Sequence, residues 1–258
     1  MDLKILQWNC RGIYRKLLEF KHYLTNLNRT PDVIALQETH LIQRYTPRIK
    51  NYVLIRKDRD VRGGGICFFV KNNLPFNEVE LENLGEIEAQ CISVQGVIIT
   101  NVYIPPNHSI PKRYLERIFT RRNRRSVFVG DFNAHHSLWS DAVANTNGKY
   151  LYDILDAENL AIVNTTDPTR IDISRIKYSL LDLTIVSPSL APNSKVVVTE
   201  NLFGSDHCII DITLEYTFLR RSSFTSSWLL RTADWTSFAS ICETAIPHIC
   251  EEEPKKKF

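Results

Sequence analysis

The sequence predicts an α/β fold in which two β-sheets pack face to face and helices cover them from outside. The chain has 258 residues, of which 43% are hydrophobic and 10% aromatic, enough for one large core or two small ones. Apolar runs typical of strands outnumber those typical of helices. The connections between strands mix hairpins with helical crossovers, which argues against a purely parallel, doubly wound sheet.

The N-terminal region alternates strand and helix. The run "LKILQWN" at 3–9 is typical of a strand, and residues 15–28 form a predicted helix that Pro31 ends. The apolar face of this helix consists of Leu17, Phe20, Leu24 and Leu27. A second short strand, 32–38, then ends in polar residues.

A turn and a hairpin are predicted in the middle of the chain. The glycine-rich stretch "RGGG" at 62–65 leads into the strand 66–70, and two β-branched runs, 88–94 and 97–104, are separated by Gly96. The later predicted elements are a helix at 111–119, a strand at 126–131, a helix at 148–160, and strands at 161–164, 179–186 and 206–214.

The chain changes character after residue 216. Serines and turn-forming residues break the periodicity, a weak helical pattern follows at 235–246, and the last eight residues, "EEEPKKKF", are almost entirely charged. We therefore expect one domain over 1–216 and a linker, or the start of another segment, over 217–258.

The charge and the cysteines indicate which partners and which cellular compartment to expect. The net charge of +3 permits a polyanionic partner without requiring one, and four cations concentrate in "RRNRR" at 121–125, a run that is also typical of a solvated helix end. The cysteines are Cys10, Cys67, Cys91, Cys208, Cys242 and Cys250. No two have C-x-x-C spacing, so we expect reduced thiols and an intracellular protein. The N-terminus lacks a secretory pattern, and no apolar run reaches the roughly 20 residues of a membrane span.

Polar side chains recur where apolar strands end. They are Asn9, Glu38, Tyr103, Asp131, Asn133, Asp182, Asp206 and His207. Each alone is typical of a turn or a core position, but their joint occurrence indicates a pocket at one rim of the sheets. Carboxylate and amide oxygens predominate, which favours Mg²⁺ or Mn²⁺ over Zn²⁺.

The stretch "GDFNAHH" at 130–136 is the densest of these sites. Asp131 and Asn133 are two residues apart, so on an extended segment both point to one side while Phe132 points into the core. His135 and His136 are expected to be loop residues or a local cap.

Six motifs together resemble one known superfamily. They are "QWNCRG", "LQETH", "NVYIPP", "GDFNAHH", "SLLDLTI" and "GSDH". Their order and spacing over residues 3 to about 215 are similar to the endonuclease/exonuclease/phosphatase superfamily, which includes pancreatic DNase, apurinic/apyrimidinic endonucleases and inositol polyphosphate phosphatases. The stretches "GDFNAHHSLWS", "NTNGKYLYDIL" and "TADWTSFASIC" most resemble the endonuclease domains of insect-type non-LTR (LINE) retrotransposons. This resemblance implies a four-layer α/β sandwich of the DNase type, and a reverse transcriptase after residues 217–258 in the intact polypeptide.

The resemblance also implies a metal site and a proton-transfer site. Glu38 would hold Mg²⁺, with Mn²⁺ as a possible substitute, and Asn9 and Asp206 would lie close to the ion. His207 would be the neutral base that accepts a proton from water, and Asp182 would hold its tautomer.

Three more residues complete the implied catalytic set. Tyr103 and Asn133 would donate hydrogen bonds to phosphate oxygens. Asp131 would either position the water or protonate the leaving group, and this choice stays open.

Duplex DNA is the expected partner. Thr169 and Ser205 match positions that support either the site or the DNA backbone, and "RIDISRIKY" at 170–178 predicts a rim hairpin that would enter a DNA groove. The cations expected at DNA are Arg170, Arg175, Lys177 and Arg62.

The implied function is metal-dependent nicking of duplex DNA for target-primed retrotransposition, with 3′-hydroxyl and 5′-phosphate products. The alternatives are an abasic-site repair endonuclease, a phosphomonoesterase or sphingomyelinase of the same superfamily, and a decayed domain that only binds DNA. The absence of an arginine-rich stretch near Asp182 and the basic run at 121–125 favour DNA. An intracellular protein that acts in the nucleus is expected, and its oligomeric state stays open.

Overall fold

The computed structural model describes residues 2–59, 63–106, 109–119, 125–140, 143–172, 174–216 and 234–245. Internal contacts divide the chain into two compact units, Met1–Thr217 and Phe218–Phe258. The second unit contains helix α4 (Trp235–Ala245). Arg62 and residues 121–124 lie outside the described residues, so the roles predicted for them stay predictions.

The described part of the first unit contains two six-stranded sheets. The first has the order β13 (Ser194–Val198), β14 (Ile210–Glu215), β1 (Asp2–Asn9), β2 (Val33–Gln37), β4 (Ile66–Lys71) and β3 (Tyr52–Lys57). The second has the order β5 (Phe76–Val79), β6 (Glu88–Val94), β7 (Val97–Tyr103), β8 (Ser126–Asp131), β12 (Asp182–Val186) and β9 (Ala161–Ile162). Each sheet is mixed, because β1 pairs parallel with β2 and β7 with β8 while the other pairs are antiparallel.

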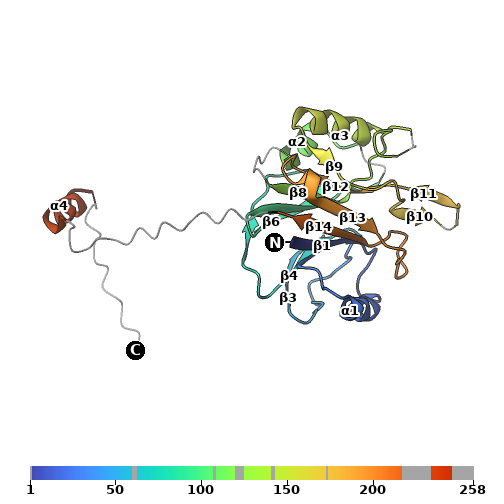
Figure 1. Ribbon diagram of the computed structural model, residues 1–258, viewed down its shortest axis with the longest axis horizontal. Helices are drawn as coiled ribbons and strands as arrows, with labels where there is room; N and C mark the ends of the chain where they lie inside the picture. Colours follow the sequence, from blue (N-terminus) through green and yellow to red (C-terminus); the bar gives the residue numbers. More distant parts are fainter. Residues whose placement is uncertain are drawn as a thin grey trace. The chain divides into compact units, whose positions relative to one another are not determined.

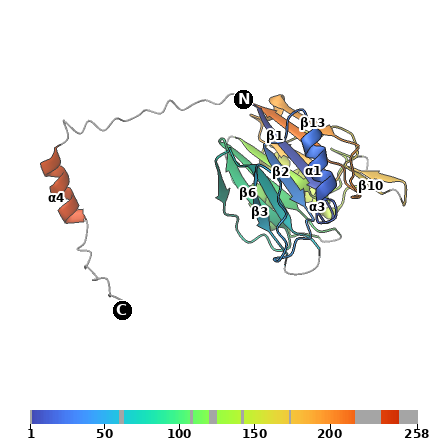
Figure 2. The ribbon, with the colours of Figure 1, turned by 90° about the horizontal axis from the view of Figure 1, so that it is seen from below.

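Helices cover the outer face of each sheet. Helix α1 (Leu17–Asn26) lies across the sheet that contains β1 and β2, and α2 (Lys112–Phe119) and α3 (Thr146–Ala157) lie on the outer face of the other sheet (Figures 1 and 2). A short 3₁₀ helix, Ala191–Asn193, precedes β13. The predicted four-layer α/β sandwich is therefore confirmed.

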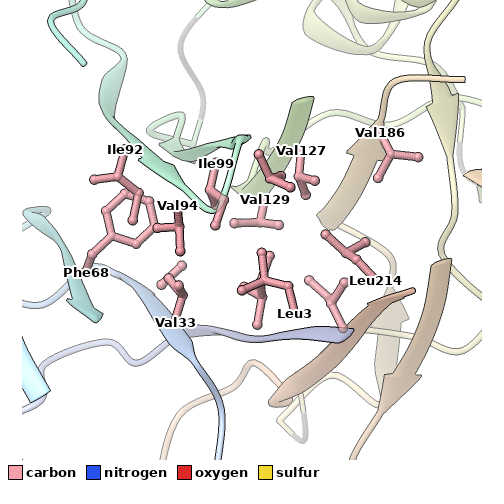
Figure 3. Close-up of a cluster of buried hydrophobic side chains, with 14 of the residues drawn as sticks. Leu3, Val33, Phe68, Ile92, Val94, Ile99, Val127, Val129, Val186 and Leu214 are labelled. Atoms are coloured by element: carbon pink, nitrogen blue, oxygen red, sulfur yellow. The ribbon is translucent and has the colours of Figure 1, made fainter. Parts of the chain in front are cut away.

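Hydrophobic side chains from the two sheets fill the space between them. Leu3, Val33 and Phe68 of the first sheet face Ile99 and Val129 of the second (Figure 3). All five are fully buried, and burial of one such side chain stabilises a fold by about 1.5–3 kcal/mol. Alternate residues of β1, such as Leu6 and Trp8, instead pack under α1. Both faces of the strand are thus buried, which explains its nearly continuous apolar sequence.

The strand register places polar residues at one rim of this sandwich. Asn9 at the end of β1 pairs with Gln37 at the end of β2, and Tyr103 at the end of β7 pairs with Asp131 at the end of β8. Strand β12 runs antiparallel to β8, so its first residue, Asp182, lies opposite Asp131. Strand direction and register together therefore bring residues from five strands to one rim.

Three strands were not predicted. Strands β3, β5 and β13 lie at or next to sheet edges, where their exposed positions interrupt the apolar pattern. The run predicted as one strand at 179–186 is divided, because Ser179 ends a separate hairpin and the sheet strand starts at Asp182. Helix α3 starts at Thr146 rather than 148, since the side chain of Asn145 caps it by accepting a bond from the Gly148 amide.

The remaining strands, β10 (Arg170–Asp172) and β11 (Lys177–Ser179), form the predicted hairpin. They form a separate two-stranded sheet and project from the body of the domain in both views (Figures 1 and 2). The described cysteines are Cys10, Cys67, Cys91, Cys208 and Cys242, and all five are free thiols. None of the described helices is long and apolar enough to cross a membrane.

Candidate functional site

The centre of the site is a row of three buried side chains, joined by one hydrogen bond and one longer ion-pair contact. His207 Nδ1 lies 2.7 Å from Asp182 Oδ2, and His207 Nε2 lies 3.8 Å from Asp131 Oδ2. Asp182 is fully buried, Asp131 is 1% exposed and His207 is 4% exposed. Water is therefore largely excluded from the contacts between these groups, which strengthens their electrostatic interactions. We call these three residues the proton-transfer centre.

The charges in this centre alter its protonation. Burial lowers the pKa of His207, but the carboxylates of Asp182 and Asp131 outweigh this effect and raise it to about 9. Burial raises the pKa of Asp131 to about 7 against the opposing charge of His207. These shifts favour the imidazolium form of His207 at neutral pH, whereas the predicted role as base requires the neutral form, so that role stays a prediction. Asp131 is the group whose pKa lies near neutral.

Backbone and amide contacts hold Asp182 in place. Thr169 Oγ1 accepts hydrogen bonds from the amides of Leu181 and Asp182 at 3.1 and 3.0 Å. The side chain of Asn164 donates to the Asp182 carbonyl at 3.0 Å, and Gln7 Nε2 lies 3.5 Å from Asp182 Oδ1. The sequence reasoning missed Gln7 and Asn164. Gln7 lies two residues before Asn9 on β1, so strand alternation was the signal that could have identified it.

Asn9 joins the proton-transfer centre to Glu38. Its Nδ2 donates to Glu38 Oε1 at 3.0 Å and to Asp131 Oδ2 at 2.8 Å. Ser205 Oγ donates to the Asn9 carbonyl at 2.7 Å and accepts from the His207 amide at 3.2 Å. The fully buried Thr169 and the 9% exposed Ser205 therefore support the site. The sequence left two roles open for Thr169 and Ser205, support of the site or contact with the DNA backbone. Side chains this deeply buried suit the first role and not the second.

A strained loop presents the Glu38 side chain. Glu38 and His40 both have positive φ, at +47° and +50°, which is uncommon for residues with a Cβ. Carbonyls of the glycine-rich turn hold this segment, as His40 N donates to Gly64 O at 3.0 Å. The turn itself needs glycine, since Gly64 has a φ of +65° and a Cβ there would lie 2.3 Å from the Glu88 carboxylate.

Tyr103 faces the same carboxylates. Burial raises the pKa of its phenol, and the charges of Glu38 and Asp131 raise it further. The phenol therefore keeps its proton and remains a hydrogen-bond donor at every physiological pH.

The residues around Asn9 suit a hard divalent cation. Glu38 and Asp131 supply carboxylate oxygens and Asn9 an amide, the donor types that Mg²⁺ and Mn²⁺ prefer. The Glu38 side chain is 20% exposed, so an ion can reach it from solvent. Asp131, Asp182 and His207 also have ligand atoms within 4.8 Å of one another, and His207 Nδ1 is hydrogen-bonded to Asp182 Oδ2.

Two arginines compete with the metal role predicted for Asp206, which stays a prediction. Its Oδ1 lies 3.3 Å from Arg11 Nη1, and its Oδ2 lies 2.9 Å from Arg170 Nε. Burial raises the pKa of Asp206, but the charges of His207, Arg170 and Arg11 outweigh burial and lower it. Its carboxylate is already balanced by cationic side chains.

The predicted geometry of Asn133 is also corrected. Phe132 is fully buried as expected, but Asn133 has a φ of +44° and lies in a turn rather than in an extended segment. Its amide N–H donates to Asp131 Oδ1 at 3.1 Å, and its Nδ2 donates to the Ile104 carbonyl at 2.8 Å. A side-chain amide has two N–H groups, so this bond uses one of them.

The two histidines that follow lie in the loop between β8 and α3. The backbone of His135 exchanges hydrogen bonds with Asn145, the residue that caps α3. The ring of His136 stacks on Tyr152 of α3, with 4.6 Å between ring centroids. They thereby fix the loop that follows Asp131 onto helix α3.

Known proteins are similar to this chain in sequence and in fold. Residues 97–211 match a family model described as endonuclease-reverse transcriptase. The chain is 26% identical over 223 residues to the probable RNA-directed DNA polymerase from transposon BS of Drosophila melanogaster, covering 83% of this chain and 24% of that protein. It is 24% identical over 174 residues to the RNA-directed DNA polymerase from mobile element jockey of Drosophila funebris, covering 65% of this chain and 19% of that protein. The chain thus spans at most 24% of the length of these relatives.

Solved structures share the fold. The endonuclease domain of TRAS1, a telomere-specific non-LTR retrotransposon, superposes with a TM-score of 0.65 at 19% identity, covering 83% of this chain and 99% of that one. The AP endonuclease LMAP from Leishmania major superposes with a TM-score of 0.66 at 15% identity, covering 84% and 88%. Over residues 97–211 the chain is similar to the endonuclease-reverse transcriptase family, and its fold is that of the TRAS1 endonuclease domain and of AP endonucleases.

Proposed function

We propose that residues 1–216 nick duplex DNA by hydrolysing one phosphodiester bond, with Mg²⁺ as cofactor and 3′-hydroxyl and 5′-phosphate ends as products. One observation carries the proposal: Asn9 donates to both Asp131 and Glu38, and so holds a proton acceptor beside a candidate metal ligand at the rim of the sheets. Phosphodiester hydrolysis requires these two functions together, an activated water and a neutralised phosphate.

Glu38 and Asn9 would hold the divalent ion, with Mn²⁺ able to replace Mg²⁺. The bound ion would neutralise the phosphate and stabilise the departing 3′-oxygen. The buried chain around Asp131 would carry out the proton transfer.

The protonation states of the side chains indicate which one would accept the proton of water and which would donate hydrogen bonds to the phosphate. Asp131 has a pKa near neutral and would take the proton from the attacking water. His207, held as an imidazolium by Asp182, and the protonated Tyr103 would donate hydrogen bonds to phosphate oxygens. The second N–H of Asn133 would contribute a further donor.

DNA is favoured as substrate by the charge beside the centre. Arg11 of the β1–α1 loop and Arg170 of the β10–β11 hairpin contact Asp206, next to His207, and Arg175 and Lys177 lie further along the hairpin. Arginine and lysine at such positions suit a backbone of phosphates. Because the curated relatives are named RNA-directed DNA polymerases, we propose that the intact polypeptide also carries a reverse transcriptase. Nicking would then prime reverse transcription at a target site in the nucleus.

A plasmid-nicking assay tests the proposal. We expect the protein to convert supercoiled plasmid to the open circle with Mg²⁺ or Mn²⁺ and EDTA to stop the reaction. Nicks with 3′-hydroxyl and 5′-phosphate ends are sealed by DNA ligase without prior end repair, so sealing identifies the products. Failure to nick with either metal, or nicks that ligase cannot seal, would contradict the proposal.

A second cleavage assay distinguishes this function from abasic-site repair. A duplex oligonucleotide with one synthetic abasic site is compared with the matched intact duplex. We expect similar cleavage of both, whereas cleavage confined to the abasic site would assign the protein to repair. Release of inorganic phosphate from inositol phosphates without DNA nicking would assign it to the phosphomonoesterases.

A further inference from the structure

A charged cluster lies beside the proton-transfer centre and is not used by it. Asp206 accepts from Arg170 Nε at 2.9 Å and lies 3.3 Å from Arg11 Nη1. The Asp206 side chain is only 18% exposed, while those of Arg170 and Arg11 are 37% and 61% exposed. The carboxylate is thus the buried base of the cluster, and the two guanidinium groups are its solvent-facing surface.

The backbone directs both arginines to this point from different parts of the fold. Arg170 begins β10 and forms an isolated antiparallel bridge with His207, the neighbour of Asp206. The Ile171 amide also donates to the Asp206 carbonyl at 2.8 Å. This pairing ties the base of the hairpin to the catalytic segment and sets the position of Arg170.

Arg11 is held from the opposite side. It follows Asn9 by two residues, and its φ of +44° is uncommon for a residue with a long side chain. Its amide donates to Asn9 Oδ1 at 3.2 Å, and Lys16 Nζ donates to its carbonyl at 2.9 Å. These contacts keep an unusual backbone conformation in place and direct the side chain to Asp206.

We propose that Arg11 and Arg170 form a phosphate-binding pair for the DNA strand that is cut, and that Asp206 is the anchor of this pair rather than a metal ligand. The proposal rests on the proposed function. Two guanidinium groups and one carboxylate carry a net charge of +1, which matches the single negative charge of a phosphodiester. The contact to Asp206 uses only Nε of Arg170, so its terminal nitrogens can bind a phosphate oxygen.

DNA binding without cleavage tests the arginine pair. A fluorescein-labelled duplex oligonucleotide is titrated with protein in EDTA, and anisotropy is read at several salt concentrations. We expect Arg11→Ala and Arg170→Ala each to weaken binding about five- to twenty-fold and to reduce the slope of log K against log salt by about one. Arg11→Lys and Arg170→Lys should recover the slope but only part of the affinity, since lysine keeps the charge without the fork of donors.

Arg29→Ala is the matched control. Arg29 is also ion-paired with two carboxylates, Asp2 and Asp32, but it lies by the first residue of β1, at the end of the strand away from Asn9. Its loss should leave the affinity and the salt slope unchanged. Equal effects of Arg29→Ala and Arg11→Ala would mean that the pair only adds general positive charge, and would overturn the proposal.

The role of Asp206 is tested separately, by measuring how much Mg²⁺ the nicking reaction of an Asp206 variant requires. We expect Asp206→Asn to leave the Mg²⁺ concentration for half-maximal nicking within twofold of the wild-type value, whereas Glu38→Gln raises it strongly or abolishes nicking. A tenfold or larger increase for Asp206→Asn would make Asp206 a metal ligand and overturn its role as anchor. Urea unfolding of each variant checks that the fold is retained, and the lysine variants provide a second test if an alanine variant does not fold.

Different results would contradict the proposed nicking function and the proposed phosphate-binding pair. If the wild-type protein neither binds nor nicks DNA, the proposed function fails and this inference with it. If the wild-type protein binds and nicks DNA while the arginine variants keep their affinity and salt slope, only this inference is wrong.

Discussion

The proton-transfer centre and the β10–β11 hairpin adjoin at Thr169 and Arg170, yet their surroundings are opposite. Asp182 is fully buried and His207 is 4% exposed, whereas Ile176 and Tyr178 on the hairpin are 80% and 60% exposed. The hairpin strands form a separate two-stranded sheet. Its base is attached through backbone bonds, from Ile171 N to Asp206 O and from Cys208 N to Thr169 O, each 2.8 Å long.

This difference shows how one domain can combine fixed chemistry with a variable binding surface. Buried charges require partners for every polar atom, so few substitutions at the centre are tolerated. An exposed hairpin joined through its backbone can change its side chains with little effect on the core. The following predictions test this division, starting with the largest expected effect.

Loss of the centre should abolish turnover without abolishing DNA binding. We expect His207→Asn and Asp182→Asn to reduce the nicking rate by a factor on the order of 10² or more, because each removes charge that acts at the transition state. Affinity for duplex DNA, measured by anisotropy in EDTA, should change far less than the rate, by about threefold, since His207 would add only one phosphate contact to ground-state binding. His22→Asn, on the exposed side of α1, is the matched control. Wild-type nicking by either variant would remove the centre from the mechanism.

The metal-free protein should lose stability as pH rises. The pKa of His207 increases on folding from 6.5 to about 9, and that of Asp131 from 3.8 to about 7. The folded state thus holds more protons than the unfolded chain between pH 4 and pH 9. The stabilisation by His207 is complete below pH 6.5 and is lost as pH rises through 9. We expect the free energy of unfolding to fall by roughly 1–3 kcal/mol from pH 6 to pH 9.

Urea unfolding in EDTA at a series of pH values measures this decline. His207→Asn should show a much smaller change between pH 7 and pH 9. Mg²⁺ should restore stability at high pH, because a bound cation replaces the lost positive charge. A wild-type stability that is constant or increases from pH 6 to pH 9 would show that the imidazolium is not stabilised by its carboxylate partners.

Thr169 lies where the two regions meet, and its hydroxyl should act on the centre. Thr169→Val removes the acceptor of two buried amides and is expected to destabilise the fold by about 1–3 kcal/mol. The nicking rate should also fall, by about tenfold, because Asp182 loses its positioning bond. Thr169→Ser keeps the hydroxyl and should recover both properties. Equal rates for the valine and serine variants would restrict Thr169 to packing.

The tip of the hairpin should have the smallest effect on rate and the largest on target choice. Exchange of residues 172–177 for a short glycine-containing turn keeps Arg170 and Ile171, which contact Asp206. We expect the stability to change by less than about 0.5 kcal/mol and the plasmid-nicking rate to stay within about twofold. Sequencing the nick sites on one long duplex should reveal different positions. An unchanged pattern would place specificity outside the hairpin.

The sequence by itself determined the layered architecture and most of the residues at the rim. Alternation along β1 and β8 encodes which side chains face the core, and polar residues that end apolar runs, such as Asn9 and Asp131, show where strands stop. Both signals are local, so they can be recognised without knowing the partners of a strand. Exposed edge strands such as β13 lack the apolar alternation and were missed.

Only the tertiary structure decided which of these polar groups act together. The resemblance paired Asp182 with His207 and placed Asp206 near the ion, but only the structure shows that Asp206 faces two arginines. The distinction depends on the register of β12 with β8 and on the bridge from Arg170 to His207. Protonation follows the same contacts, because the pKa of a buried group is determined by the charges placed within a few ångströms of it. Such contacts join residues far apart in the chain, and no local pattern records them.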